Sequence, residues 1–229
     1  MKIAERMHAL VPALSGEQCE QFQIYYEMLS DWNTRINLTA ITDPEEIAQK
    51  HFLDSLAALP HLPAGAKCID VGTGAGFPGV PLLIARPDLS VTLLDSLNKR
   101  LVFLEALLTE LGLQKQAELV HMRAEDAGRD PKYGEQYDFA LSRAVAGLPV
   151  LMELTIPLLK VGGYSICYKG EAKEEIAVAA NAADKLHGSL SWETVPSRYG
   201  VRTLVMIRKD QKTAAAYPRK AGTPAKKPL

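Results

Sequence analysis

The segment Asp70–Gly79 limits the possible folds more than any other part of the chain. It places four glycines within ten residues, directly after the short apolar run Lys67–Val71. An apolar run that ends in closely spaced glycines is typical of a buried strand that turns into a helix. Glycine permits a tight turn and lets a ligand approach the backbone, while a helix N-terminus offers free N–H groups. The segment therefore predicts a strand, a ligand-binding turn and a helix.

Strand-like and helix-like segments alternate from residue 67 onward. We expect helices over 99–111, from the end of the fourth strand through Leu158, and over 171–187; Gly112 is placed to end the first. Five strand–helix units imply a doubly wound α/β fold with a parallel sheet and right-handed crossovers. The last two strands are joined by a short link, so one of them must run antiparallel. The expected strands cover 67–71, 90–95, 118–122, 137–142, 164–168, 190–195 and 203–208.

Residues 1–60 show helical patterns only, and we expect them to form an N-terminal helical extension packed on the core. Ser15 and Gln18 have the spacing of a capping box. Asp43 followed by Pro44 is typical of a second helix start, because proline needs no donor in the first turn.

The charge of the chain is divided unevenly, although its net value is only −1. Residues 198–229 hold nine Lys or Arg against the single acid Asp210, a charge of +8, while 1–197 carry −9. An acidic body with a basic end indicates a polyanionic partner, and a solvated tail that aids solubility is the alternative. We expect a core over 61–211 and a basic tail over 212–229, extended or mobile unless it is bound.

Composition excludes several classes of protein. No run approaches 18 consecutive apolar residues, which excludes a membrane span, and the charged N-terminus lacks the cleavage site of a secretory signal. Cys19, Cys68 and Cys167 are far apart, and an odd, sparse cysteine count suits a reducing cytoplasm. The five histidines show no ligand spacing. We therefore expect a cytoplasmic protein without a metal site, with Cys68 and Cys167 in its core.

The spacing of the glycines separates two classes of ligand. Residues 74–79 match the dinucleotide pattern GxGxxG, but Gly72 is the first glycine after the strand and Asp70 stands two residues before it. An acid followed by GxGxG suits a ligand with a cationic amino-acid end rather than a pyrophosphate. S-adenosylmethionine is such a ligand, and its α-amino group could be met near Asp70, directly or through water. A glycine turn without a ligand is the alternative.

Polar side chains also follow the next three strands, at the sheet edge where such folds bind ligands. Asp95 can accept hydrogen bonds from ribose hydroxyls. Arg123 and Glu125 could contact an adenine, and Arg143 could contact a cofactor carboxylate, a phosphate or a guanine edge. Structural roles remain open for all four: a strand-end or N-capping aspartate, a surface Arg–Glu pair and a salt bridge. The Pro-Pro tetrapeptide common in methylation of exocyclic amino groups is absent after Ser142.

Besides the glycine segment, seven further short segments are similar to one family, and they lie in order along nearly the whole chain. This family is the bacterial small-subunit ribosomal RNA methyltransferase G, also called glucose-inhibited division protein B. The segments are Asn37–Thr39, His51–Ser55, Leu94–Arg100, Arg123–Glu125, Ser142–Ala146, Tyr217–Lys220 and Gly222–Pro224.

The resemblance implies methyl transfer from S-adenosylmethionine to N7 of one guanine in the decoding region of small-subunit (16S) ribosomal RNA. It implies a Rossmann-like, seven-stranded methyltransferase sheet whose last strand is antiparallel. By resemblance, cofactor contacts fall on Gly72, Phe77, Ala124, Glu125 and Arg143. The other expected members of the cofactor site are Asp70, Gly74, Gly76 and Asp95.

N7 of guanine carries a lone pair and no proton, so we expect catalysis by positioning, without a catalytic acid or base. Arg143 is expected to be held by the cofactor carboxylate or an RNA phosphate and to transfer no proton. Phe77 or Tyr168 could stack on the base, although core packing fits both. His51, Asp54 and Ser55 could border the same pocket, with helix packing and capping as the alternative.

The expected partner is small-subunit ribosomal RNA or the ribosomal subunit, bound by a monomer through salt-dependent contacts. A free tail and a solvated helix start are the alternatives for these basic residues. The expected phosphate contacts are Lys99, Arg100, Lys212, Arg219, Lys220, Lys226 and Lys227.

Other functions stay open at this stage. They are a methyltransferase acting on a small molecule or another RNA position, an NAD-linked dehydrogenase, and a non-catalytic RNA-binding protein. Asp70 before the glycines and the lack of a separate substrate domain disfavour the dehydrogenase.

Overall fold

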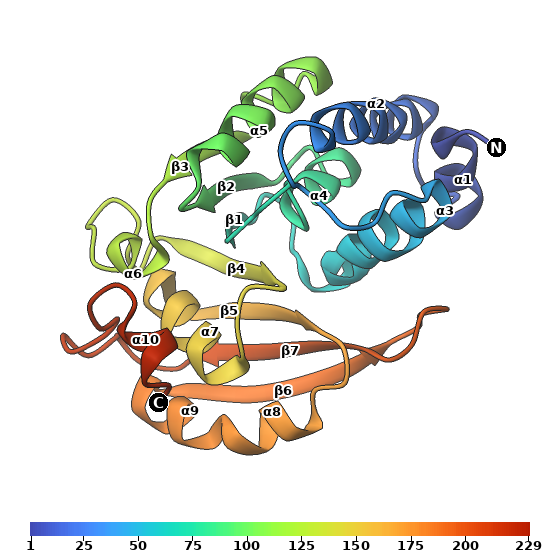
Figure 1. Ribbon diagram of the computed structural model, residues 1–229. Coiled ribbons are helices and arrows are strands. Elements are labelled where there is room, and N and C mark those ends of the chain that lie inside the picture. Colours follow the sequence, from blue (N-terminus) through green and yellow to red (C-terminus); the bar gives the residue numbers. More distant parts are fainter.

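The computed structural model describes residues 1–229, and a seven-stranded sheet forms its centre (Figure 1). The strand order is β3-β2-β1-β4-β5-β7-β6, and β7 runs antiparallel to both of its neighbours. The other neighbouring pairs are parallel, which confirms the predicted fold class. The strands are β1 (Lys67–Val71), β2 (Ser90–Asp95), β3 (Ala117–His121), β4 (Tyr137–Arg143), β5 (Leu159–Lys169), β6 (Gly188–Val195) and β7 (Arg202–Lys209).

Helices cover both faces of the sheet (Figure 1). The N-terminal helices lie with α4 and α5 on one face, and α7, α8 and α9 lie on the other. No helix combines the length and the apolar character needed to cross a bilayer. The helices are α1 (Ile3–Leu10), α2 (Gly16–Asn33), α3 (Pro44–Glu46), the π-helical η1 (Ile47–Leu53), the 3₁₀ turn η2 (Leu56–His61), α4 (Gly79–Ala85), α5 (Asn98–Leu111), α6 (Ala124–Ala127), α7 (Leu148–Thr155), the 3₁₀ turn η3 (Ile156–Leu158), α8 (Lys173–Val178), α9 (Ala180–Leu186) and α10 (Thr223–Lys226).

The N-terminal helices share one hydrophobic core with the sheet. The rings of Phe22 and Tyr25 lie 5.0 and 5.1 Å from the ring of Phe52, and Phe77 of the glycine segment packs against Tyr25 at 5.3 Å. Burying each such ring stabilises the fold by about 1.5–3 kcal/mol. Residues 1–60 are therefore fixed relative to the glycine segment and can supply one wall of a site there.

The predicted ends of several helices agree with the structure. Ser15 and Gln18 form the capping box: the Gln18 N–H donates to Ser15 Oγ at 3.1 Å, and the Ser15 N–H donates to Gln18 Oε1 at 2.8 Å. The Glu46 N–H donates to Asp43 Oδ1 at 3.0 Å at the start of α3. Gly112 ends α5 with a φ of 70°. Cys68 and Cys167 are buried free thiols, as predicted.

Two predicted element boundaries are wrong. Residues 171–187 form two helices instead of one, since the chain breaks at Ala179, which is fully buried in the apolar cluster that also contains residues of α7. The fifth strand begins at Leu159 rather than Tyr164. Gly162 and Gly163, which precede the predicted strand, lie within β5 where its pairing with β4 is irregular, and a Cβ at Gly163 would lie 2.8 Å from the Asp138 carbonyl oxygen.

The prediction of an extended or mobile tail is also wrong. Residues 212–229 fold back onto the body of the protein and end in the short helix α10, which lies beside α7 (Figure 1). Pro218 and Pro224 are buried, whereas the lysines of this segment are exposed. The sequence pattern did not reveal this docking, because the contacts are scattered: isolated apolar residues such as Tyr217 and Leu229 combine with polar and ionic contacts, without a periodic apolar face.

Candidate functional site

The glycine segment forms a tight turn between β1 and α4. The N–H groups of Gly72 and Thr73 donate to the Leu94 carbonyl oxygen at 2.9 and 3.1 Å, and the Gly74 N–H donates to Asp95 Oδ2 at 3.0 Å. Gly72 has a φ of 71°, and a Cβ there would lie 2.8 Å from a methyl group of Val145. The backbone therefore requires glycine at this position, both for its conformation and for its close approach to the segment after β4.

Asp70 lies beneath this turn and is fully buried. Its Oδ2 accepts hydrogen bonds from the Thr73 hydroxyl at 2.7 Å and from the Gly79 N–H at 3.0 Å, while Oδ1 has no partner. Burial raises the pKa of this carboxyl to about 6, against the effect of both hydrogen bonds. Asp70 thus organises the turn from behind and leaves one oxygen unsatisfied.

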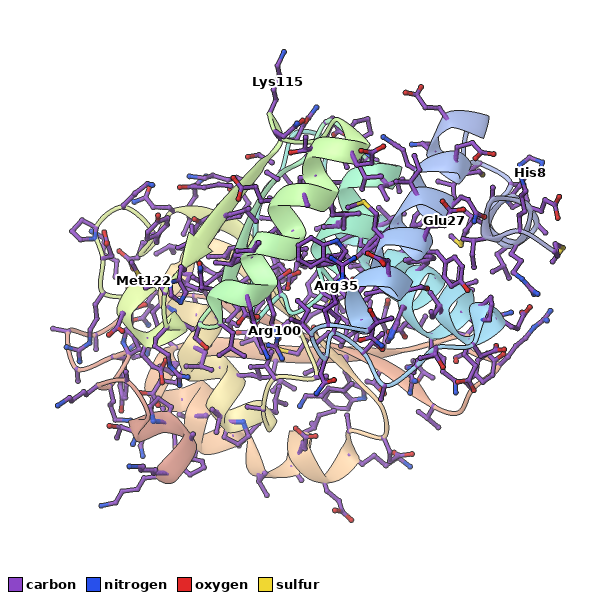
Figure 2. All side chains as sticks on the ribbon, turned by 45° about the horizontal axis from the view of Figure 1, so that its top comes forward. His8, Glu27, Arg35, Arg100, Lys115 and Met122 are labelled. Carbon is purple, nitrogen blue, oxygen red and sulfur yellow. The ribbon has the colours of Figure 1, made fainter.

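A first cavity of about 220 Å³ opens at the carboxyl ends of β1, β2 and β3. Figure 2 shows two of its residues, Arg100 on α5 and Met122 after β3. Five residues predicted to contact the cofactor also line it: Gly72, Asp95, Arg123, Ala124 and Glu125. These predicted positions thus come together in one cavity.

Asp95 is almost fully buried at the edge of the first cavity. Its Oδ2 accepts from the Gly74 N–H and from Arg100 Nη1 at 3.2 Å, and its Oδ1 accepts from the Leu97 N–H at 2.8 Å. In the structure, the Arg100 side chain therefore points to Asp95 and lines the first cavity. From the sequence, Arg100 was predicted to contact RNA phosphates. Lys99 is exposed at the start of α5.

Glu125 is buried in the wall of the first cavity, with 2% of its surface exposed. Its Oε1 accepts from the Gly222 N–H at 2.8 Å and from Arg123 Nη2 at 3.3 Å. Burial opposes ionisation, but these donors outweigh it and lower the pKa of this carboxyl. The cavity wall therefore contains a carboxylate, oriented in part by the C-terminal segment.

A second cavity of about 370 Å³ lies between η1, the ends of β4 and β5, and the start of β7. It shares Ala144 with the first cavity. Ala144 has a φ of 55°, a conformation that costs energy for any residue except glycine and is frequent at functional sites. Four cations and one carboxylate line this second cavity: Lys50, Arg143, Lys169, Arg202 and Asp54.

Arg143 is fixed in the second cavity by groups of the N-terminal extension. Its Nη1 donates to the Lys50 carbonyl oxygen at 3.1 Å and to Asp54 Oδ2 at 3.2 Å, and its guanidinium lies 4.7 Å from the centre of the Phe77 ring. Arg202 pairs with the other oxygen of Asp54 at 3.2 Å. The sequence predicted a cofactor carboxylate or an RNA phosphate as the partner of Arg143, but here protein groups hold it.

His51 lines the second cavity as a neutral imidazole. Burial, followed by the charge of Arg143, lowers its pKa to about 4. Arg143 Nη2 lies 3.3 Å from His51 Nδ1 and can only donate, so the proton of the neutral ring belongs on Nε2, which lies 2.8 Å from Thr39 Oγ1. With both ring nitrogens engaged, His51 is not available as a general base.

The structure separates the other residues that were predicted to border this pocket. Asp54 and Tyr168 line the second cavity, whereas Ser55 is fully buried and donates to the His51 carbonyl oxygen at 2.6 Å. Phe77 is buried, with His51 stacked at 4.6 Å and Tyr25 at 5.3 Å, so its ring lines neither cavity. Ser55 and Phe77 therefore have the packing roles that were predicted as their alternatives. Gly74 and Gly76 shape the turn without lining a cavity.

The basic residues of the C-terminal segment fall into two groups. Lys212, Lys220, Lys226 and Lys227 are exposed, while Arg219 pairs with the fully buried Glu153 through Nη2 and Oε2 at 2.6 Å. Arg219 therefore has an internal partner, and its predicted contact with an RNA phosphate stays a prediction.

Sequence reasoning missed several residues of the site. Lys169 follows a strand end at the ligand-binding edge, which was a usable signal. Glu153 is a lone acid within the apolar helix Leu148–Thr155, a pattern that indicates a buried cationic partner. Lys50 and Arg202 gave no local signal, because they reach the cavity only through the packing of distant elements. Ser96, Met122, Val145 and Leu154 complete the wall of the first cavity.

A glycine turn, a seven-stranded sheet with one antiparallel strand and a cavity at the carboxyl edge together define a Rossmann-like methyltransferase. The structure is similar to that of precorrin-6y C5,15-methyltransferase from Geobacter metallireducens, with a TM-score of 0.51, 12% identity and coverage of 76% of this chain and 91% of that chain. The model of the family described as GidB, rRNA small subunit methyltransferase G, matches residues 18–203. The chain belongs to this family.

Two curated relatives support the family assignment over almost their full length. Both are named ribosomal RNA small subunit methyltransferase G. The protein from Desulfitobacterium hafniense is 50% identical over 220 residues, covering 94% of this chain and 91% of the relative. The protein from Desulforamulus reducens is 48% identical over 222 residues, covering 94% and 92%.

Proposed function

We propose that this methyltransferase uses S-adenosylmethionine to methylate N7 of a guanine in the decoding region of small-subunit (16S) ribosomal RNA. In this proposal the cofactor binds in the first cavity and the guanine nucleotide in the second. The observation that carries the arrangement is that Ala144 lines both cavities, so the two cavities are neighbours. A methyl donor and its acceptor must lie next to each other without intervening water, and neighbouring cavities fit this requirement.

The residues present fit the proposed cofactor. Asp70 Oδ1 is a buried acceptor without a partner, as expected where the ammonium end of a ligand, directly or through water, completes the site. Asp95 and Glu125 would face the ribose and the base, and the turn at Gly72 would let the ligand approach the backbone. When bound, S-adenosylmethionine supplies an electrophilic methyl group on a sulfonium centre.

The second cavity suits an acceptor that needs no deprotonation. His51 is neutral with both nitrogens engaged, and Asp54 is paired with two arginines, so neither is placed to remove a proton. N7 of guanine needs no such base, because its lone pair lies in the plane of the ring. Positioning and exclusion of water then carry catalysis, an effect that contributes about 7–11 kcal/mol in favourable cases.

The charge around the cavities suits an RNA substrate. Asp54 pairs with both Arg143 and Arg202 and so offsets part of the positive charge near a guanine that becomes cationic on methylation. The exposed Lys99, Lys220 and Lys226 are available for phosphates, which would make RNA binding salt-dependent. Ribosomal RNA as the substrate would place the protein in the cytoplasm.

Mass spectrometry of ribosomal RNA from cells with and without the gene tests the proposal. We expect one 7-methylguanosine in the decoding region of the small-subunit RNA to disappear with the gene and to return on complementation. An unchanged set of 7-methylguanosines would contradict the proposed substrate.

Ligand titration of the purified protein tests the cofactor separately. We expect S-adenosylmethionine to bind with one-to-one stoichiometry and NAD to show no saturable binding. Binding of NAD alone would contradict the methyltransferase site, and binding of neither ligand would contradict every enzymatic function considered.

A further inference from the structure

The C-terminal segment is anchored to the body by a buried ion pair. Glu153 of α7 is fully buried and accepts four hydrogen bonds from Arg219. The Arg219 backbone N–H donates to Oε1 at 2.7 Å, Nε donates to Oε1 at 2.8 Å and to Oε2 at 3.1 Å, and Nη2 donates to Oε2 at 2.6 Å. A bidentate contact of this kind fixes both position and orientation. Residues near Arg219 are therefore held in one place on the surface of α7.

The same segment reaches the first cavity three residues later. Gly222 has a φ of 80°, and its N–H donates to Oε1 of Glu125 at 2.8 Å. Arg123 also donates to this carboxylate, but at the longer distance of 3.3 Å and with a side chain about half exposed. Gly222 thus makes the shorter of these two contacts to Glu125.

A third contact ties the segment to the other end of α6, the helix that carries Ala124 and Glu125. Arg129 Nε donates to the Pro218 carbonyl oxygen at 2.7 Å. Pro218 also packs so closely on Gly128 that a Cβ at Gly128 would lie 2.9 Å from the proline ring. The segment 217–222 therefore contacts α6 near its start and just after its end.

We propose that Arg219 and Gly222 are positioning residues of the cofactor site. Arg219 fixes the segment on α7, and the segment then holds Glu125 and α6 in the geometry that forms the wall of the first cavity. The basic C-terminus accordingly acts in cofactor binding. This inference rests on the proposed function, since it takes the first cavity as the S-adenosylmethionine site.

The test measures S-adenosylmethionine affinity by calorimetry with the full-length protein and without RNA. We expect Arg219→Gln to weaken binding at least fivefold. This variant leaves the Glu153 carboxylate buried without its ion pair. The double variant Glu153→Gln/Arg219→Gln removes both charges and is therefore measured as well. We expect the double variant also to bind S-adenosylmethionine at least fivefold more weakly than the wild type. If both variants bind like the wild type, the inference is wrong.

Two controls separate positioning from general loss of stability. Arg208→Gln removes an Arg–carboxylate pair with Asp210 outside both cavities and should leave the affinity unchanged. Leu186→Ala creates a void in the core at α9, so it should lower the melting temperature without weakening cofactor binding. A loss of affinity in Leu186→Ala equal to that in Arg219→Gln would overturn the inference.

A double-mutant cycle shows whether Arg219 acts through Glu125. If it does, Arg219→Gln causes little further loss of affinity in a Glu125→Ala background, since the group it positions is already absent. Fully additive losses would show that Arg219 acts elsewhere and would overturn the inference. If the wild type itself does not bind S-adenosylmethionine, the proposed function fails. If the wild type and the variants bind it equally well, only the inference about Arg219 fails.

Discussion

Asp70 shows how far residue types predict a site and where they stop. An acid at the end of the first strand, before a glycine turn, was predicted from spacing. Its partners were not predictable, because the donors Thr73 and Gly79 meet it only after the turn has folded. The structure shows that Oδ2 of Asp70 holds the turn together from beneath, while Oδ1 is left without a partner.

The ionisation of Asp70 predicts a pH dependence of stability. Its folded-state pKa of about 6 lies above the ordinary value of 3.8, so folding favours the protonated form. That contribution is full below about pH 3.8 and is lost as the pH rises through 6. From pH 4 to pH 7 we expect the wild type to lose up to about 3 kcal/mol of unfolding free energy relative to Asp70→Asn. Urea unfolding of both cofactor-free proteins across this range measures the difference, and parallel curves would contradict it.

Arg143 provides a second prediction at the residue scale. Arg143→Ala removes its ion pair with Asp54 and its hydrogen bonds to the η1 carbonyl groups. We expect a loss of about 3 kcal/mol in unfolding free energy, typical of breaking a mostly buried pair, and a fall in kcat/KM of at least tenfold because the second cavity loses its shape. Urea unfolding and methyl-transfer assays measure these changes. Wild-type activity in this variant would contradict the assigned role.

Among the elements, the C-terminal segment was the least predictable. Its Pro, Ala and Lys composition is typical of a mobile tail, and its docking depends on Arg219, Gly222 and the distant Glu153 and Glu125. The strands, in contrast, were predicted well, since their apolar runs are local. Boundaries failed where tertiary packing decides them, as at Ala179 and within β5.

The exposed lysines of this segment predict the salt dependence of RNA binding. Replacing Lys220, Lys226 and Lys227 with Gln should reduce the slope of log affinity against log salt by about 2, since each lost phosphate contact removes about 0.7. Filter binding to small-subunit RNA at several salt concentrations measures the slope. A matched triple change to Gln at the exposed Lys115, Lys173 and Lys185 should leave it unchanged; Lys115 projects at the far end of α5 (Figure 2). Equal slopes in the two triple variants would contradict the prediction.

For the whole molecule, the decisive feature is that the second cavity is built jointly by the N-terminal extension and the sheet. His51 and Asp54 come from the extension, and Arg143, Lys169 and Arg202 come from strands. The sequence predicted both parts and left open whether His51, Asp54 and Ser55 border the pocket or only pack in the helix, because no local pattern records which faces meet. Only the resemblance to a family placed their residues in one functional context.

The shared core predicts cooperative unfolding of the extension and the sheet. Phe52→Ala empties the space where Phe22, Tyr25 and Phe77 meet, and we expect it to lower the unfolding free energy by about 3–5 kcal/mol. Fluorescence of Trp32 in the extension, measured in a Trp192→Phe background because Trp192 lies in β6, and far-ultraviolet circular dichroism of the whole chain should report a single, coincident transition. Two separate transitions would show that the parts fold independently.

Methyl transfer in a purified system tests the central claim most directly. Small-subunit particles from cells that lack the gene are incubated with the protein and isotopically labelled S-adenosylmethionine, and the RNA is digested and analysed by mass spectrometry. The two joined cavities predict label in 7-methylguanosine at one guanine of the decoding region, and none in particles that already carry the modification. Label in any other nucleoside, or an absence of label with a folded, cofactor-binding protein, would contradict the account.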